Sequence, residues 1–183
     1  MGIQKVDVGI KGVYAILMHR FPLEPVLAIE KKTPEEQCEI AAYRTTKGEL
    51  FIPGVNLQRA FIAGATFSKG KGRATLQKPV AACVFVTPEH LILDPQEYNI
   101  DSRAVVVPAT KGRIVRHRPR VEEGWTLEFT LEFDDALLME KQLRTVIDDT
   151  GSRVGIGDFR PEKKGPFGRF MVTKWETCKK KGK

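Results

Sequence analysis

Three side chains in this sequence have the chemistry of a general acid or base. His19 is next to Arg20, His117 lies among arginines, and Tyr14 precedes both. An imidazole titrates near neutral pH and can pass a proton to or from a reacting oxygen. His19 and His117 are therefore candidates for metal-independent cleavage of RNA, with Tyr14 as a helper. A phosphate contact or simple packing is the favoured explanation of each histidine, because the spacing fixes no second titratable partner.

Phosphate binding by arginine is a second possible chemistry. The segment 103–120 contains no acidic residue and carries these basic side chains: Arg103, Lys111, Arg113, Arg116, His117, Arg118 and Arg120. Guanidinium groups bind phosphate oxygens in pairs, but the segment lacks aromatic residues on which bases could stack. It predicts contact with the backbone of a single-stranded nucleic acid more than reading of its bases. Further candidate cations are Arg20, Arg59, Lys69, Lys71 and Arg73.

The segment 155–168 is rich in glycine and basic residues. Glycines leave backbone amides uncovered and permit positive φ, so successive N–H groups could surround a phosphate. A plain turn with incidental charge explains the same composition, and both interpretations stay open. The candidate binding residues here are Gly155, Gly157, Arg160, Lys163, Lys164, Gly165, Gly168 and Arg169. A dinucleotide fingerprint is excluded, because Arg160 stands where its third glycine should be.

Composition excludes several other classes of protein. The formal net charge of +7 in 183 residues favours a polyanionic partner. Cys38, Cys83 and Cys178 are odd in number and widely spaced, and no paired-carboxylate or H-E-x-x-H pattern occurs, so we expect no disulfide, metal or cofactor. No apolar run approaches the ~20 residues of a membrane-spanning helix. We expect a cytoplasmic protein without a membrane partner.

Hydrophobic periodicity predicts the elements that must position these residues. Apolar and polar residues alternate at 6–10 and, without error, at 125–133, so both segments are predicted strands. Thr33, Pro34 and Glu36 predict a capped helix that ends near Tyr43.

The remaining elements follow from similar patterns. We expect a brief strand at 49–52, a helix from Leu57 to about Phe67, a doubly buried strand at 80–86 and a final strand at 170–175. A further helix is predicted after Asp134 or Asp135, with an apolar stripe formed by Ala136, Met139, Leu143, Val146 and Ile147. Gly151 is its predicted left-handed stop.

The order of these elements predicts the fold class. Without the segment 88–122, which reads as an inserted basic β-hairpin, the order is β, α, β, β, α, β. That is the α+β pattern of ferredoxin-like and RNA-recognition-motif folds. We expect one domain over 1–175, including the inserted ribbon 88–122, and a basic tail at 176–183. Glu128 and Glu132 on the wet face of the sheet would repel phosphate, so nucleic acid should avoid that face.

Two short motifs resemble a known family. The glycine-rich loop between the last helix and last strand resembles the signature loop of the RAMP superfamily, the repeat-associated proteins of CRISPR systems. The segment 51–60 is similar to the strand, Pro-Gly turn and helix start of that superfamily's backbone subunits. The resemblance covers about residues 3–175. Superfamily members that cut target RNA carry an aspartate in the loop after the first strand, whereas the loop 14–32 contains Glu24 and Glu30 but no aspartate.

This resemblance implies a non-catalytic subunit that lines up along single-stranded RNA. It implies a path for the strand over the glycine loop, the 69–73 loop and the arginine-rich insertion. We expect a homo-oligomer along the strand or a subunit of a larger ribonucleoprotein. Two alternatives stay open: a CRISPR-RNA-type endoribonuclease using His19 or His117, and a phage or mobile-element protein that binds single-stranded DNA or assists assembly.

Overall fold

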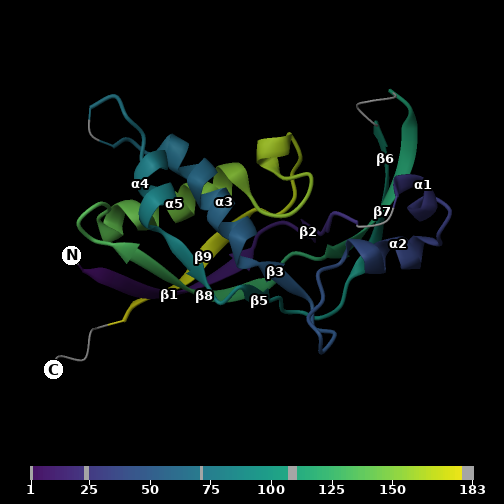
Figure 1. The fold of residues 1–183 in the computed structure, drawn as a ribbon, viewed down its shortest axis with the longest axis horizontal. Helices are drawn as coiled ribbons and strands as arrows, with labels where there is room; N and C mark the ends of the chain where they lie inside the picture. The colour runs from purple at the N-terminus through teal and green to yellow at the C-terminus, as the bar shows by residue number, and fades with distance from the viewer. Residues whose placement is uncertain (1, 23–24, 71, 107–110, 179–183) are drawn as a thin grey trace.

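A four-stranded antiparallel sheet forms the base of the molecule, and helices cover one of its faces (Figure 1). This computed structural model describes residues 2–22, 25–70, 72–106 and 111–178. The strand order in the sheet is β4-β8-β1-β9. This is the order of a ferredoxin-like core, in which the first and third core strands lie side by side at the centre, and it confirms the predicted fold class.

The strands and helices follow the chain in a fixed order. The strands are β1 (Ile3–Gly12), β2 (Ile16–Leu17), β3 (Phe51–Pro53), β4 (Phe85–Thr87), β5 (His90–Ile92), β6 (Asn99–Val106), β7 (Arg113–Val121), β8 (Thr126–Asp134) and β9 (Phe170–Thr177). The α-helices are α1 (Val26–Ile29), α2 (Pro34–Ala41), α3 (Gly54–Gly64), α4 (Gln77–Cys83) and α5 (Glu140–Asp149). Short 3-10 turns cover Ala65–Phe67 and Pro161–Lys163, and a π-helical turn covers Thr150–Val154.

The two strands with the clearest alternation pair with each other at the centre of the sheet. β1 runs antiparallel to β8, with Val8 opposite Phe129. The apolar side chains of both strands point to the face that α3 and α5 cover, and Phe61 of α3 packs on Phe129 with ring centroids 6.0 Å apart. Burying this one face is what fixes the register, because a slip of one residue would expose the whole apolar set.

The segment 80–86 corrects one prediction. It is not a doubly buried strand: residues 77–83 form α4, and only the three residues 85–87 enter the sheet as the edge strand β4. Val80, Cys83 and Val84 are buried while Ala81 and Ala82 are exposed. That spacing of three and four residues is helical. A short run of small apolar residues fits either structure until its neighbours are known.

The last helix also differs from the prediction at both ends. Asp134 accepts a hydrogen bond from the Ala136 amide at 3.0 Å, but the helix begins only at Glu140. Gly151 does not stop it, because the chain continues through the π-helical turn and Gly155, at φ +71°, ends it. A Cβ on Gly151 would lie 2.3 Å from the carbonyl oxygen of Phe170. Gly151 is therefore needed for the close approach of β9.

The predicted hairpin is present, but it is formed by β6 and β7 alone, and β5 at the start of the predicted segment 88–122 pairs with β3 instead. β6 and β7 pair antiparallel over their whole lengths, and β2 adds to β7 as a third strand. This hairpin extends away from the four-stranded sheet, with α1 and α2 beside it (Figure 1). The predicted cap of α2 is confirmed: Thr33 and Glu36 bond reciprocally to each other's backbone amides.

The cysteines and helices have the following surroundings in the described part of the chain. Cys38 and Cys83 are buried and unpaired, and burial raises the pKa of the Cys38 thiol to about 11, so it stays protonated at neutral pH. In the ranges that the structure describes, no group of histidines, cysteines and carboxylates is arranged to hold a metal ion. No described helix is long and apolar enough to cross a membrane.

Candidate nucleic-acid interface

The glycine-rich loop uses most of its backbone amides inside the protein. The amide of Ile156 donates to the carbonyl of Gly168 at 2.9 Å, that of Gly168 donates to Ala15 at 2.8 Å, and that of Asp158 donates to Leu17 at 2.8 Å. The amides of Gly155 and Gly165 are likewise bonded to backbone carbonyls. The loop is therefore a closed structural turn, and these N–H groups are not free to surround a phosphate.

The glycines are required by the path of this turn. Gly155, Gly157 and Gly168 have positive φ. A Cβ on Gly168 would lie 1.7 Å from the carbonyl oxygen of Ile156, and one on Gly165 would lie 1.8 Å from that of Phe159. No L side chain fits at these distances, so these residues serve the shape of the loop.

The loop packs against the arginine-bearing face of the hairpin. Strand alternation places Arg116, Arg118 and Arg120 of β7 on one face, and Arg103 of β6 lies opposite Arg116. Arg118 is only 7% exposed and its Nη1 lies 2.9 Å from Oδ2 of Asp158 in the loop. This ion pair fixes the base of the hairpin to the glycine loop.

An aromatic side chain of the loop adds to the same contact. The guanidinium groups of Arg103 and Arg120 lie 4.8 and 5.8 Å from the centre of the buried Phe167 ring. The two arginines also pair with carboxylates, Arg103 with Asp101 at 2.7 Å and Arg120 with Glu122 at 2.9 Å. The arginine-rich segment thus has counter-charges that lie outside it in sequence, and Arg103, Arg118 and Arg120 already have protein partners.

The other predicted cations divide into paired and unpaired groups. Arg160 pairs with Glu162, and Arg169 lies 5.4 Å from the centre of the Tyr14 ring. Among the described residues, no ion pair engages the following candidates: Arg20, Arg59, Lys69, Arg73, Lys111, Arg113, Arg116, Lys163 and Lys164. Arg116 is half-buried, whereas Lys163 is exposed.

The structure does not bring the 69–73 loop to the hairpin. This loop follows the C-terminal end of α3, at the opposite end of the molecule from β6 and β7 (Figure 1). Lys69 and Arg73 are exposed there, and Lys71 lies outside the described residues. The glycine loop and the hairpin form one surface, and the 69–73 loop is separate from it.

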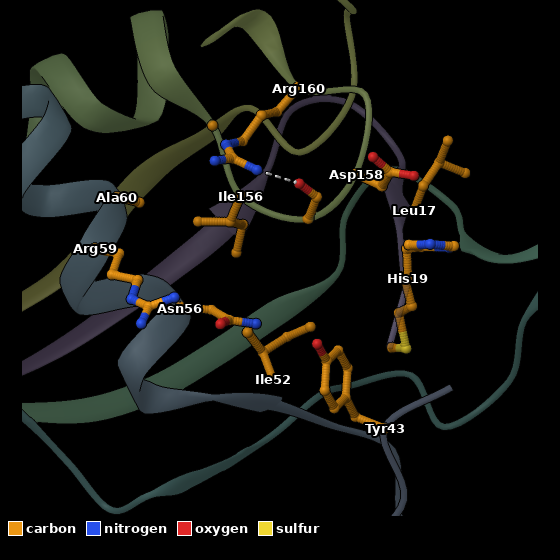
Figure 2. Close-up of a pocket in the computed structure, with 13 residues that line it drawn as sticks. Leu17, His19, Tyr43, Ile52, Asn56, Arg59, Ala60, Ile156, Asp158 and Arg160 are labelled. Atoms are coloured by element: carbon orange, nitrogen blue, oxygen red, sulfur yellow. Dashed lines mark hydrogen bonds between the residues drawn. The ribbon is translucent and has the colours of Figure 1, made fainter. Parts of the chain in front are cut away.

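A cavity of about 290 Å³ opens beside the glycine loop. The loop and the N-terminal turns of α3 face each other across it, and residues 17–19 and Tyr43 complete the wall (Figure 2). Figure 2 shows Tyr43 and Asn56 pointing into this space, while Arg160 is held to the carbonyl of Gly157 at 2.9 Å. The cavity sits where the sheet, the hairpin base and α3 meet.

The two histidines lie at one place and Tyr14 at another. His19 and His117 both line a second cavity of only about 20 Å³, together with Arg20 and Arg116. The Nδ1 atom of His117 lies 2.7 Å from the hydroxyl of Ser102. Loss of solvent lowers the pKa of His19, and the nearby charge of Asp158 opposes that effect, so the ring is neutral at pH 7.

No protein-family model matches the chain, and no curated protein matches it in sequence. Its fold has a solved counterpart. The chain is similar to one in the cryo-EM structure of the Type III-B Cmr-beta bound to cognate target RNA, with a TM-score of 0.59 and 11% sequence identity.

This likeness covers 97% of the chain but only 61% of its counterpart. The chain therefore spans less than two thirds of the length of the protein it matches. At 11% identity the match shows the fold alone, which is a mixed α+β arrangement.

Two cavity residues were missed by reasoning from the sequence. Asn56 lies inside the segment 51–60 that carries the family resemblance, but a single polar residue in a turn gives no signal of its own. Tyr43 closes a polar-rimmed cavity from a position just after α2. Their proximity depends on the packing of α3 against the glycine loop, which no local pattern encodes.

Proposed function

We propose that this protein is a non-catalytic subunit that binds single-stranded RNA on the surface formed by the glycine loop, the N-terminal turns of α3 and the hairpin. The main observation behind this proposal is that unpaired cationic side chains and carboxylates lie on different surfaces of the protein. Unpaired Arg59 and Arg116 lie on this side, and unpaired Arg113 lies on the other face of the same hairpin. The open face of the sheet instead presents Glu128, Glu132 and Asp7. Phosphate is attracted to the first surface and repelled by the second.

The open face keeps its negative charge under ordinary conditions. A hydrogen bond from the Thr130 hydroxyl lowers the pKa of Asp7, which therefore stays ionised at neutral pH. Two of the lysines on this face are used in ion pairs, Lys5 with Glu132 and Lys174 with Glu176, and Lys11 lies farther along β1. The solved structure that contains the similar chain is of Type III-B Cmr-beta bound to cognate target RNA, and this supports RNA over DNA as the partner. A place in a ribonucleoprotein, or in a homo-oligomer along the strand, is part of the same proposal.

Salt dependence of RNA binding tests this proposal. If about five phosphates are neutralised, log K should fall against log salt with a slope of roughly −3 to −4. The measurement is fluorescence anisotropy of a labelled single-stranded RNA, with DNA of the same sequence as competitor. Binding that does not change from low to moderate salt would contradict a backbone-phosphate interface, and preference for DNA would favour the mobile-element alternative.

Cleavage is the second candidate function, because His19 and His117 line one small cavity with two arginines. A cavity of about 20 Å³ has room for about one water molecule and is too small for a nucleotide. We therefore expect a labelled RNA hairpin to stay intact on incubation with the protein in EDTA. Cutting that disappears in His19→Ala would replace the binding proposal with the endoribonuclease.

A further inference from the structure

The larger cavity combines an apolar floor with a polar rim. Its floor is formed by aliphatic side chains from four segments: Leu17, Met18, Ile52, Ala60 and Ile156. Its rim carries the hydroxyl of Tyr43, the amide of Asn56 and the guanidinium of Arg59 (Figure 2). A volume of about 290 Å³ corresponds to about ten molecules of liquid water, which leaves room for a planar ring system.

The rim groups have hydrogen-bonding capacity that the protein does not use. Within the part of the chain that the structure describes, neither the Tyr43 hydroxyl nor the Asn56 amide hydrogen-bonds to another residue. The polar groups on the opposite wall already have partners within the protein. Asp158 pairs with Arg118, and Arg160 is bonded to Glu162 and to the carbonyl of Gly157. The free donors and acceptors are thus concentrated on the side of Tyr43 and α3.

This arrangement does not suit a phosphate or a metal ion inside the cavity. A phosphate needs converging cations or amides, but Arg160 is already paired and the floor is aliphatic. A metal ion needs several carboxylate, histidine or cysteine ligands, and Asp158 is the one carboxylate among the lining residues. An apolar floor with neutral polar groups at the rim suits a flat heterocycle whose faces are apolar and whose edge makes hydrogen bonds.

We infer that the cavity takes one nucleobase of the bound strand, with Tyr43 and the aliphatic floor against the ring and Asn56 at its edge. Arg59, one turn along α3, then meets the phosphate of the same nucleotide. This inference rests on the proposed function and goes beyond it, because it adds a base-binding subsite to an interface otherwise made of phosphate contacts. His19, neutral at pH 7, adds a second planar ring at the cavity wall without repelling or attracting the strand.

An abasic strand separates base binding from backbone binding. The affinities of a labelled single-stranded RNA and of an abasic strand of equal length are measured for the wild type, Asn56→Ala and Tyr43→Ala. Gln58→Ala is the matched control, because Gln58 lies on the same turn of α3 but does not line the cavity. We expect the wild type to bind RNA about tenfold more tightly than the abasic strand, given the usual energy of base stacking.

Both cavity variants should lose most of this preference while keeping their affinity for the abasic strand and their salt slope. Thermal unfolding checks that Tyr43→Ala is folded, and Asn56→Ala, which removes no ring packing, carries the test if it is not. Equal binding of RNA and the abasic strand by the wild type would overturn the nucleobase subsite and leave the proposed function standing. Failure of the wild type to bind either strand would instead overturn the proposed function itself.

Discussion

Replacing Gly168 by alanine should lower the free energy of unfolding by about 3 kcal/mol, a shift of roughly 6–12 °C in Tm. Two effects combine at this position. Gly168 has φ +68°, and its added Cβ would lie 1.7 Å from the carbonyl oxygen of Ile156. Because that carbonyl belongs to the backbone of the same turn, relief requires the whole loop to move.

Two other glycines separate the strain of a positive φ from the steric clash of an added Cβ. Gly48 has φ +85° and nothing within 4 Å of its added Cβ, so Gly48→Ala should cost only about 1 kcal/mol. Gly165 lacks a positive φ but its Cβ would lie 1.8 Å from the Phe159 carbonyl, so Gly165→Ala reports the clash alone. Thermal denaturation of the three variants is the measurement. Equal Tm values for Gly168→Ala and Gly48→Ala would show that the loop is not the closed turn described above.

Removing the side chain of Arg118 should destabilise the protein by about 2 kcal/mol. Arg118 is nearly buried against Asp158, whose side chain is 33% exposed, so the penalty falls below that of a fully buried ion pair. Asp158→Asn should cost a similar amount, because it leaves the charge of Arg118 buried without a partner. The Nε atom of Arg118 already has no hydrogen bond within the described structure.

Urea unfolding of the single and double variants tests this coupling. Arg118→Met combined with Asp158→Asn should cost less than the sum of the two single changes, because neither charge is then left alone. Arg113→Ala is the control: Arg113 is exposed on the same strand, and its loss should change stability by about 0.5 kcal/mol or less. If Arg118→Ala were as stable as Arg113→Ala, the ion pair would not be what links the hairpin to the loop.

Local patterns were sufficient to predict the central elements of the fold. The alternation at 125–133 fits only a strand with one buried face, and the segment 6–10, which pairs with it, has the same two-residue period. The capping residues Thr33 and Glu36 likewise lie three positions apart and act on each other's backbone. Such features depend on neighbours in the sequence, so the sequence predicts them well.

The errors arose where distant residues decide the outcome. Residues 80–86 became helix and edge strand because of what packs on Val80 and Cys83, and Gly151 is required by the approach of Phe170 from the next strand. The candidate site shows the same limit. Segment 103–120 contains no acidic residue, but the fold brings Asp158 to within 2.9 Å of Arg118. The sequence identified the basic residues but not which of them form ion pairs within the protein.

The choice between the two faces of the molecule is tested most directly by one binding experiment. Salt titrations of RNA affinity are compared for Arg59→Ala/Arg113→Ala/Arg116→Ala and for Glu128→Gln/Glu132→Gln. The arginine variant should bind more weakly, and its salt slope should flatten by about two units, because three phosphate partners are lost. The glutamine variant should bind almost as the wild type does, with a small gain from the higher net charge. A larger effect of the glutamates than of the arginines would place the RNA on the open sheet and contradict the account.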